Sequence, residues 1–222
     1  LDSNNWPELD ETDNFLSWGW VDDNNKKIVP AFALNRYISG KNIKRVKNGM
    51  LLLVESALPP LYEPHDTTFE YGCYQLEQFR LAKTLRSDIR DQLLVRLFAH
   101  HFRTSWFYEL RWKDELPDIR LENGRTPFMS LVKKCRLVIF SFDTTGVLEL
   151  LANNFPIICF WRGGHSHIHD NETYYYELLM EVGVFHDNPE SAAKKVNEVW
   201  DDIDGWWKQD KVQDARKQFC DR

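Results

Sequence analysis

The sequence has no apolar run of the length that a membrane-spanning helix needs, which is about 18 residues. It also has no basic and apolar amino-terminal stretch of the kind that forms a signal peptide. We therefore predict no transmembrane segment. Because the chain begins with Leu1 rather than Met, we expect it to be a processed chain or a piece of a longer protein.

Cysteine is scarce, and its spacing lacks the CxxC pairs of zinc and redox sites. The four cysteines are Cys73, Cys135, Cys159 and Cys220, and two of them fall in or beside predicted buried strands. This pattern indicates reduced, structural cysteines and predicts a cytoplasmic protein. Excess positive charge is also lacking, since the net charge is -6, which argues against a nucleic-acid partner.

The signature motifs of several enzyme classes are missing as well. The chain has no Walker loop, no GxGxxG fingerprint and no Ser-His-Asp order. Interpretations as an NTPase, a dinucleotide-dependent dehydrogenase or a hydrolase therefore lose their usual support. Tryptophan, in contrast, is abundant, with nine residues, and we expect some of them to line a groove or an interface.

Short apolar runs alternate with amphipathic segments along most of the chain. Strands are predicted at 50–54, 93–98, 119–122, 137–140, 157–160 and 184–186, and helices at 75–89, 106–110, 127–134, 173–182, 189–200 and 212–219. This alternation predicts an α/β fold with a Rossmann-like, doubly wound parallel sheet. We assign residues 48–222 to this domain with its carboxyl-terminal helices. Residues 1–47 are predicted to be an irregular segment and connector, strand-like only at 27–30.

The most informative stretch is the strand, turn, helix and strand at residues 136–161. Its turn carries Ser141, Asp143, Thr144 and Thr145, which are residue types that start helices by accepting bonds from free N–H groups. Asn153 then ends the helix and Pro156 blocks its continuation. A hydroxyl-rich helix start at the carboxyl end of a parallel strand favours phosphate binding. Simple helix capping is the alternative interpretation of the same residues.

The segment SFDTTGVLELLANNFPIICFW, residues 141–161, resembles the donor-site unit of GT-B glycosyltransferases. The similarity is to a family of bacterial surface-carbohydrate transferases related to the capsule Kdo transferases and the CDP-glycerol glycerophosphotransferases. Other pieces fit in the same order: Trp18-Gly-Trp, Leu94-Val-Arg, Tyr176-Glu-Leu-Leu, Gly183-Val-Phe-His, Pro189-Glu-Ser-Ala-Ala, Trp206-Trp and Val212-Gln-Asp-Ala-Arg-Lys-Gln-Phe. The resemblance covers most of the chain.

This resemblance implies that the chain is the carboxyl-terminal, donor-binding half of a GT-B enzyme. The catalytic residues are unknown, because the base would come from an amino-terminal half that this sequence lacks. Ser141, Thr144 and Thr145 would hold the donor phosphates, Arg96 would balance their charge, and Glu149 would face the donor ribose. The partners would be a nucleotide-sugar donor and a glycan or lipid-linked acceptor. The protein would be cytoplasmic, with attachment at the inner membrane as a further option, and would need no metal cofactor.

Further candidates lie in the expected loops at the carboxyl edge of the sheet. Ser56 follows the first strand, and Arg162 and His165 lie in a Gly-rich loop where they could touch the sugar or phosphate. His165, His167, His169 and Asp170 are metal-ligating types, but their spacing in such a loop fixes no shared geometry, and we predict no metal site. His100 and His101 are acid/base candidates, with mere exposure as the alternative.

Three functional hypotheses follow. The first is a glycosyltransferase-type domain that binds a nucleotide-activated sugar, with transfer to a surface polysaccharide or other glycan. The second is a non-catalytic Rossmann-like assembly domain, whose tryptophans would form an exposed interface. The third is a sugar-phosphate epimerase of GT-B shape. For Arg96 and Glu149 the structural alternatives are a salt bridge and a solvated helix position.

Overall fold

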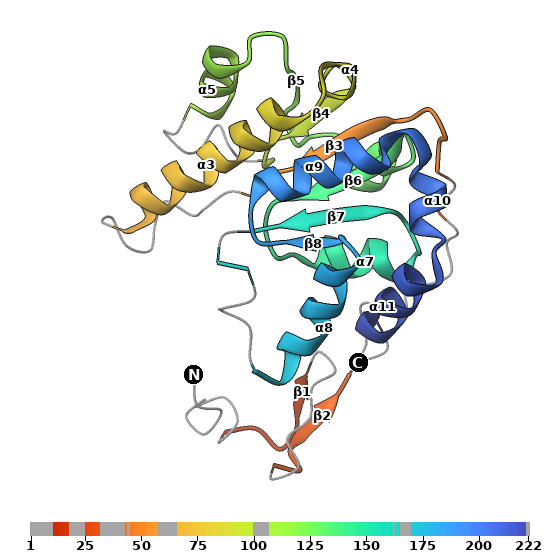
Figure 1. The fold of residues 1–222 in the computed structure, drawn as a ribbon. Coiled ribbons are helices and arrows are strands. Elements are labelled where there is room, and N and C mark those ends of the chain that lie inside the picture. The colour runs from red at the N-terminus through yellow and green to blue at the C-terminus, as the bar shows by residue number, and fades with distance from the viewer. Residues whose placement is uncertain are drawn as a thin grey trace.

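The computed structural model describes residues 11–17, 25–31, 43, 45–56, 66–99, 107–161, 163–164 and 170–220. At its centre lies a parallel sheet with the strand order β5-β4-β3-β6-β7-β8 (Figure 1). Its strands are β3 (Met50–Val54), β4 (Leu93–Arg96), β5 (Arg120–Glu122), β6 (Cys135–Phe140), β7 (Ile157–Phe160) and β8 (Phe185–His186). The predicted α/β fold with a Rossmann-like parallel sheet is confirmed.

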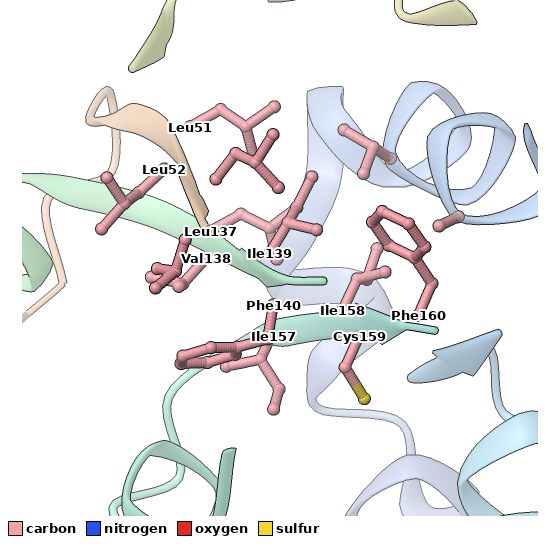
Figure 2. Close-up of a cluster of buried hydrophobic side chains, with 14 of the residues drawn as sticks. Leu51, Leu52, Leu137, Val138, Ile139, Phe140, Ile157, Ile158, Cys159 and Phe160 are labelled. Carbon is pink, nitrogen blue, oxygen red and sulfur yellow. The ribbon is translucent and has the colours of Figure 1, made fainter. Parts of the chain in front are cut away.

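The middle strands are apolar at successive positions because both faces of the sheet are covered. Figure 2 shows Leu137 and Ile139 of β6 on one face and Val138 and Phe140 on the other, in a strand that lies between β3 and β7. All of these side chains are buried. Continuous apolar runs, rather than alternation, are therefore what identified these strands in the sequence.

Helices cover both faces. They are α3 (Asp66–Thr84), α4 (Ser87–Arg90), α5 (Tyr108–Glu115), α6 (Phe128–Val132), α7 (Thr145–Ala152), α8 (Asp170–Glu181), α9 (Pro189–Val199), α10 (Ile203–Trp207) and α11 (Asp210–Cys220), with a 3-10 turn at Trp200–Asp202. Helices α3 and α9 pack against each other, although they are far apart in the sequence, and α11 packs on α7 and α8 (Figure 1). In the described part of the chain, no helix has the length and apolar character needed to cross a membrane.

The strand order places a topological switch point between β3 and β6. From β3 the chain moves outward through β4 to the β5 edge, and then crosses to β6 and moves outward through β7 to the β8 edge. Connections leave β3 and β6 in opposite directions, and this is the topology at which open α/β sheets bind ligands, in the crevice beyond the carboxyl ends of the strands. The register pairs Val54 with Phe140 at this end of the sheet.

The amino-terminal part differs from the irregular segment that we expected. Strand β1 (Phe15–Ser17) pairs in parallel with β2 (Ile28–Pro30) in a separate two-stranded sheet (Figure 1). The predicted strand-like stretch is thus present, but it pairs with residues predicted to be irregular rather than leading into the main sheet. Short strands of this kind carry little hydrophobic periodicity, and their pairing depends on a partner elsewhere in the chain.

The helix predicted at 75–89 is two helices. Arg86 has extended backbone angles and its amide donates to Asn197 Oδ1 at 2.9 Å, so it leaves the helical ladder and separates α3 from α4. A side chain of α9 thus supplies the break, which local sequence does not show. Helix α3 also begins earlier than predicted, at Asp66.

The described tryptophans belong to the core rather than to an exposed surface. Trp112, Trp161, Trp200, Trp206 and Trp207 all have relative exposures of 6% or less. The indole N–H of Trp206 donates to Val182 O, and that of Trp207 to the Asn154 carbonyl and side chain. Buried tryptophans with paired N–H groups stabilise the fold. Trp6, Trp18, Trp20 and Trp106 lie outside the described residues.

Candidate functional site

The hydroxyl of Ser141 lies at the switch point, directly after β6, but it faces the protein rather than solvent. Ser141 is 2% exposed. Its Oγ donates to Val54 O of β3 at 3.0 Å and lies 2.7 Å from the Tyr74 hydroxyl of α3. The serine that we predicted to hold phosphate therefore joins β6 to its neighbouring strand and to a helix.

The directions of these hydrogen bonds follow from the number of protons. A serine hydroxyl carries one proton, and that of Ser141 is directed at a carbonyl, which can only accept. Tyr74 must therefore donate to Ser141 Oγ. The Tyr74 oxygen in turn accepts from the Ser56 amide at 2.8 Å. The chain of bonds thus runs from Ser56 N through Tyr74 and Ser141 to Val54 O.

The exposed part of the same corner is the start of α7. Thr144 has extended backbone angles and caps the helix, with its side chain accepting from the Gly146 amide at 3.4 Å. Thr145 is the first helical residue and is exposed. A Cβ on Gly146 would lie 2.8 Å from a ring carbon of Phe140, so the glycine lets α7 approach the end of β6 closely. The first turn of a helix offers N–H donors and the positive end of the dipole.

Asp143 places a carboxylate beside this helix start. It is exposed, and its Oδ2 accepts a hydrogen bond from the Tyr176 hydroxyl of α8 at 3.2 Å. A carboxylate accepts hydrogen bonds and repels other anions. Asp143 is therefore suited to a hydroxyl group of a ligand rather than to a phosphate.

Glu149 lies one turn further along α7 than Thr145 and is half-buried. Partial burial raises the pKa of its carboxyl group above the ordinary value. The i, i+4 spacing places Glu149 on the same face of the helix as Thr145. The structure thus allows both side chains to face one ligand, and the ribose contact implied by the resemblance stays a prediction.

Arg96 ends β4 and is engaged by the loop that follows β5. Its Nη1 forms a salt bridge with Glu122 at 3.0 Å and also donates to Thr126 O at 2.7 Å. Its Nη2 donates to Gly124 O at 3.3 Å. Glu122 in turn accepts the amides of Gly124 and Thr126. The guanidinium therefore already balances one anion and fixes a turn, and its predicted phosphate contact stays a prediction.

The remaining candidates are only partly placed. Ser56 lies at the carboxyl end of β3, half-buried, with its amide on Tyr74. Arg162, His165, His167 and His169 lie outside the described residues, as do His100 and His101, and the side chain of Asp170 is not described either. Among the side chains that are described, no group of three or more His, Cys, Asp or Glu could hold a metal ion.

Sequence reasoning missed two residues at this corner, Tyr74 and Glu55. Glu55 directly follows β3 and is 4% exposed, and its Oε1 accepts from Trp112 Nε1 at 2.9 Å. Its other oxygen has no hydrogen-bond partner among the described residues. Burial raises the pKa of Glu55 to about 8, despite the bond from Trp112 that acts in the opposite direction. A charged residue immediately after an apolar strand was the available signal for Glu55.

A separate hollow lies away from this corner. It has a volume of about 760 Å³, is bordered by α5 and β5, and is lined in part by Lys113, Arg120 and Glu122. Lys113 is held there by the carbonyls of Pro117 and Ile119. None of the site candidates that the structure describes is in its lining, although Glu122 and Thr126, which bind Arg96, are. We therefore place the candidate site at the switch point instead.

Comparison with known proteins adds a family. The model of a family described as LIC12162 family transferase matches residues 1–222, the full length of the sequence. A comparison with curated proteins gave no match. The match is consistent with the predicted transfer chemistry, and it names neither a donor nor an acceptor.

Proposed function

The chain belongs to the LIC12162 family of transferases, and we propose that it binds the nucleotide-activated sugar of a glycosyl transfer reaction. The donor lies in the crevice at the carboxyl ends of β3 and β6. One observation carries this proposal: the exposed, hydroxyl-bearing start of α7 lies at the point where the strand order reverses. Ligands of open α/β sheets bind at such points.

In this proposal the donor phosphates meet the first turn of α7. The hydroxyl and the amide of Thr145 donate to phosphate oxygens, and the helix dipole compensates part of the charge. Thr144 holds the turn in shape through its bond from Gly146. Ser141 has no proton left for a phosphate, because its hydroxyl already donates to Val54 O. It supports the turn by joining β6 to β3.

The acidic side chains of the corner suit the sugar and ribose hydroxyls of a donor. Asp143 is exposed beside the helix start, and Glu149 lies one turn along the same helix. Both accept hydrogen bonds from hydroxyl groups, as polar groups in sugar sites do. With Arg96 held by Glu122, further positive charge would come from Arg162 and His165, whose predicted contacts with the donor we retain as part of the proposal.

We further propose the larger arrangement that the resemblance implies. Residues 48–222 form the donor half of a GT-B enzyme, and residues 1–47 form its amino-terminal segment and connector. Another α/β half would supply the catalytic base and the acceptor site for a glycan or lipid-linked acceptor. The transferred sugar would enter a bacterial surface polysaccharide. The alternative of an assembly domain gains no support from the described tryptophans, which are all buried.

Calorimetric titration of the chain with CMP, UDP and CDP, one nucleotide at a time, tests the proposal. We expect one of them to bind, and Thr145→Val to raise its Kd about tenfold, because a hydrogen bond to a charged oxygen is lost. Thr84→Val, at the other end of the sheet, is the matched control and leaves the Kd unchanged. If the folded chain binds none of the three nucleotides, the proposal is wrong. Sugar epimerisation without transfer would support the epimerase alternative.

A further inference from the structure

Tyr74 connects the two strand ends that border the crevice. Its hydroxyl accepts from the Ser56 amide, just after β3, and donates to Ser141 Oγ, just after β6. The backbone pairing of these strands reaches Val54 and Phe140, so the tyrosine links the two segments beyond the last paired residues. A side chain from α3 thus holds together the two sides of the switch point.

The position of Tyr74 on α3 is itself fixed. Phe79, further along α3, packs edge to face on the Trp112 ring of α5, with ring centroids 4.8 Å apart. Tyr71, one turn earlier, packs edge to face on the Tyr108 ring of α5, with ring centroids 5.1 Å apart. The helix is therefore anchored on both sides of Tyr74, and the hydroxyl cannot shift without disturbing buried contacts.

The Tyr74 proton determines whether the hydroxyl groups at this corner can donate hydrogen bonds to a phosphate. Phosphate oxygens bind donors, and the only proton of Ser141 is directed at Val54 O. The proton of Tyr74 is directed at Ser141 Oγ, as derived above. Burial raises the pKa of Tyr74 well above the ordinary value, so the phenol keeps this proton near neutral pH. Neither hydroxyl is free to donate to a ligand while the chain of bonds is intact.

We propose that Tyr74 is a positioning residue for donor binding, which rests on the function proposed above. It closes the floor of the crevice between Ser56 and Ser141 and keeps phosphate out of it. The phosphates are thereby directed to the start of α7, where the side chain of Thr145 is exposed. Tyr74 makes no contact with the donor. It acts by fixing the positions of Ser56 and Ser141 relative to each other.

Removing the hydroxyl alone tests this role. Tyr74→Phe keeps the ring and removes the hydrogen bond from the Ser56 amide to the Tyr74 hydroxyl, so hydrogen exchange at Ser56 becomes faster than in the wild type. With the nucleotide that the wild type binds, chosen from CMP, UDP and CDP, we expect the Kd of Tyr74→Phe to rise about tenfold. Ser141→Ala breaks the same chain of bonds and should raise the Kd by a similar factor. The double variant should bind about as weakly as either single variant, because the residues act as one unit.

Asn197→Ala separates positioning from general loss of stability. Asn197 accepts the Arg86 amide and donates to Thr84 O at the opposite edge of the sheet. This variant should lower the melting temperature and leave the Kd unchanged. The inference fails if Tyr74→Phe binds nucleotide as the wild type does, if Asn197→Ala weakens binding equally, or if the single effects simply multiply. A wild type that binds no nucleotide would instead remove the proposed function, and this role with it.

Discussion

At the amino edge of the sheet, arginines pair with carboxylates and carbonyls, whereas the carboxyl ends of β3 and β6 carry hydroxyl groups beside acidic side chains. Arg86 pairs with Asp88 and Asp201, and Arg45 pairs with Asp204. Arg136 lies over the Trp200 ring, with its guanidinium carbon 4.3 Å from the centroid. These cations have partners within the fold and hold α9, α10 and the strand starts together.

At the carboxyl edge, some polar side chains are exposed and remain available to bind a ligand. Ser141 and Tyr74 are used by the fold, but Thr145 is exposed at a helix start and Asp143 is exposed beside it. Polar groups that only stabilise a fold tend to be paired, and binding residues are held ready for a partner. The contrast teaches that the carboxyl edge is the place to look for function.

Arg96 breaks the contrast, because it lies at the carboxyl edge but is paired as the arginines of the amino edge are. Arg96→Met leaves the carboxylate of Glu122 without its cation in a site where both side chains are at most 15% exposed. We expect the free energy of unfolding to fall by about 3 kcal/mol, as for the loss of one partner of a buried pair. Urea unfolding followed by circular dichroism measures this change.

Arg86→Met is the control for this prediction, since it removes an arginine from an exposed ion pair, and its effect should be smaller. If Arg96 contacts only the fold, the nucleotide Kd of the folded variant stays within about twofold of the wild type. A rise of the Kd by tenfold or more, with stability unchanged, would contradict the structural role. It would support the phosphate contact predicted from the sequence.

The strands and the position of the corner were predictable because they depend on local pattern. Strand β7 matches its predicted range of 157–160, and the helix cap at Thr144 follows from residue type. The residues that bond to the side chains at the carboxyl edge were not predictable in this way. Tyr74 lies 67 residues from Ser141 in the sequence, and Glu122 lies 26 residues from Arg96. Such contacts are determined by how helices and loops pack on the sheet, which local periodicity does not contain.

The contributions of the two edges to folding stability should also depend on pH in opposite directions. At the amino edge, hydrogen bonds from Arg86 lower the pKa of Asp88 and Asp201, so their contribution to stability is lost as the pH falls. Burial raises the pKa of Glu55 from 4.5 to about 8. The folded state then holds a proton that the unfolded state has released, and its stability falls as the pH rises between these values. The slope from Glu55 is about 1.4 kcal/mol per pH unit.

Glu55→Gln should remove this slope, because glutamine is neutral and still accepts from Trp112. Urea unfolding at pH 5.5, 6.5 and 7.5 measures the difference between the variant and the wild type. The lowered pKa of buried His186 adds an opposite slope at the acid end of this range, but it does so in both proteins and cancels in the difference. A difference that does not change with pH would show that Glu55 is ionised in the folded protein.

The smallest effect on stability should come from replacing Thr144. This replacement separates helix capping from ligand binding. Thr144 caps α7 at the switch point, and Asn188 caps α9 at the β8 end of the sheet by accepting the Ser191 amide at 2.8 Å. Each change to alanine should cost about 1 kcal/mol of unfolding free energy, the usual value of a helix cap. Only Thr144→Ala should also raise the nucleotide Kd, because only its helix start borders the crevice. Calorimetry on both variants decides the matter: equal stability losses with equal affinities would make Thr144 a cap and nothing more, and the anion site would then have to lie elsewhere along the carboxyl edge.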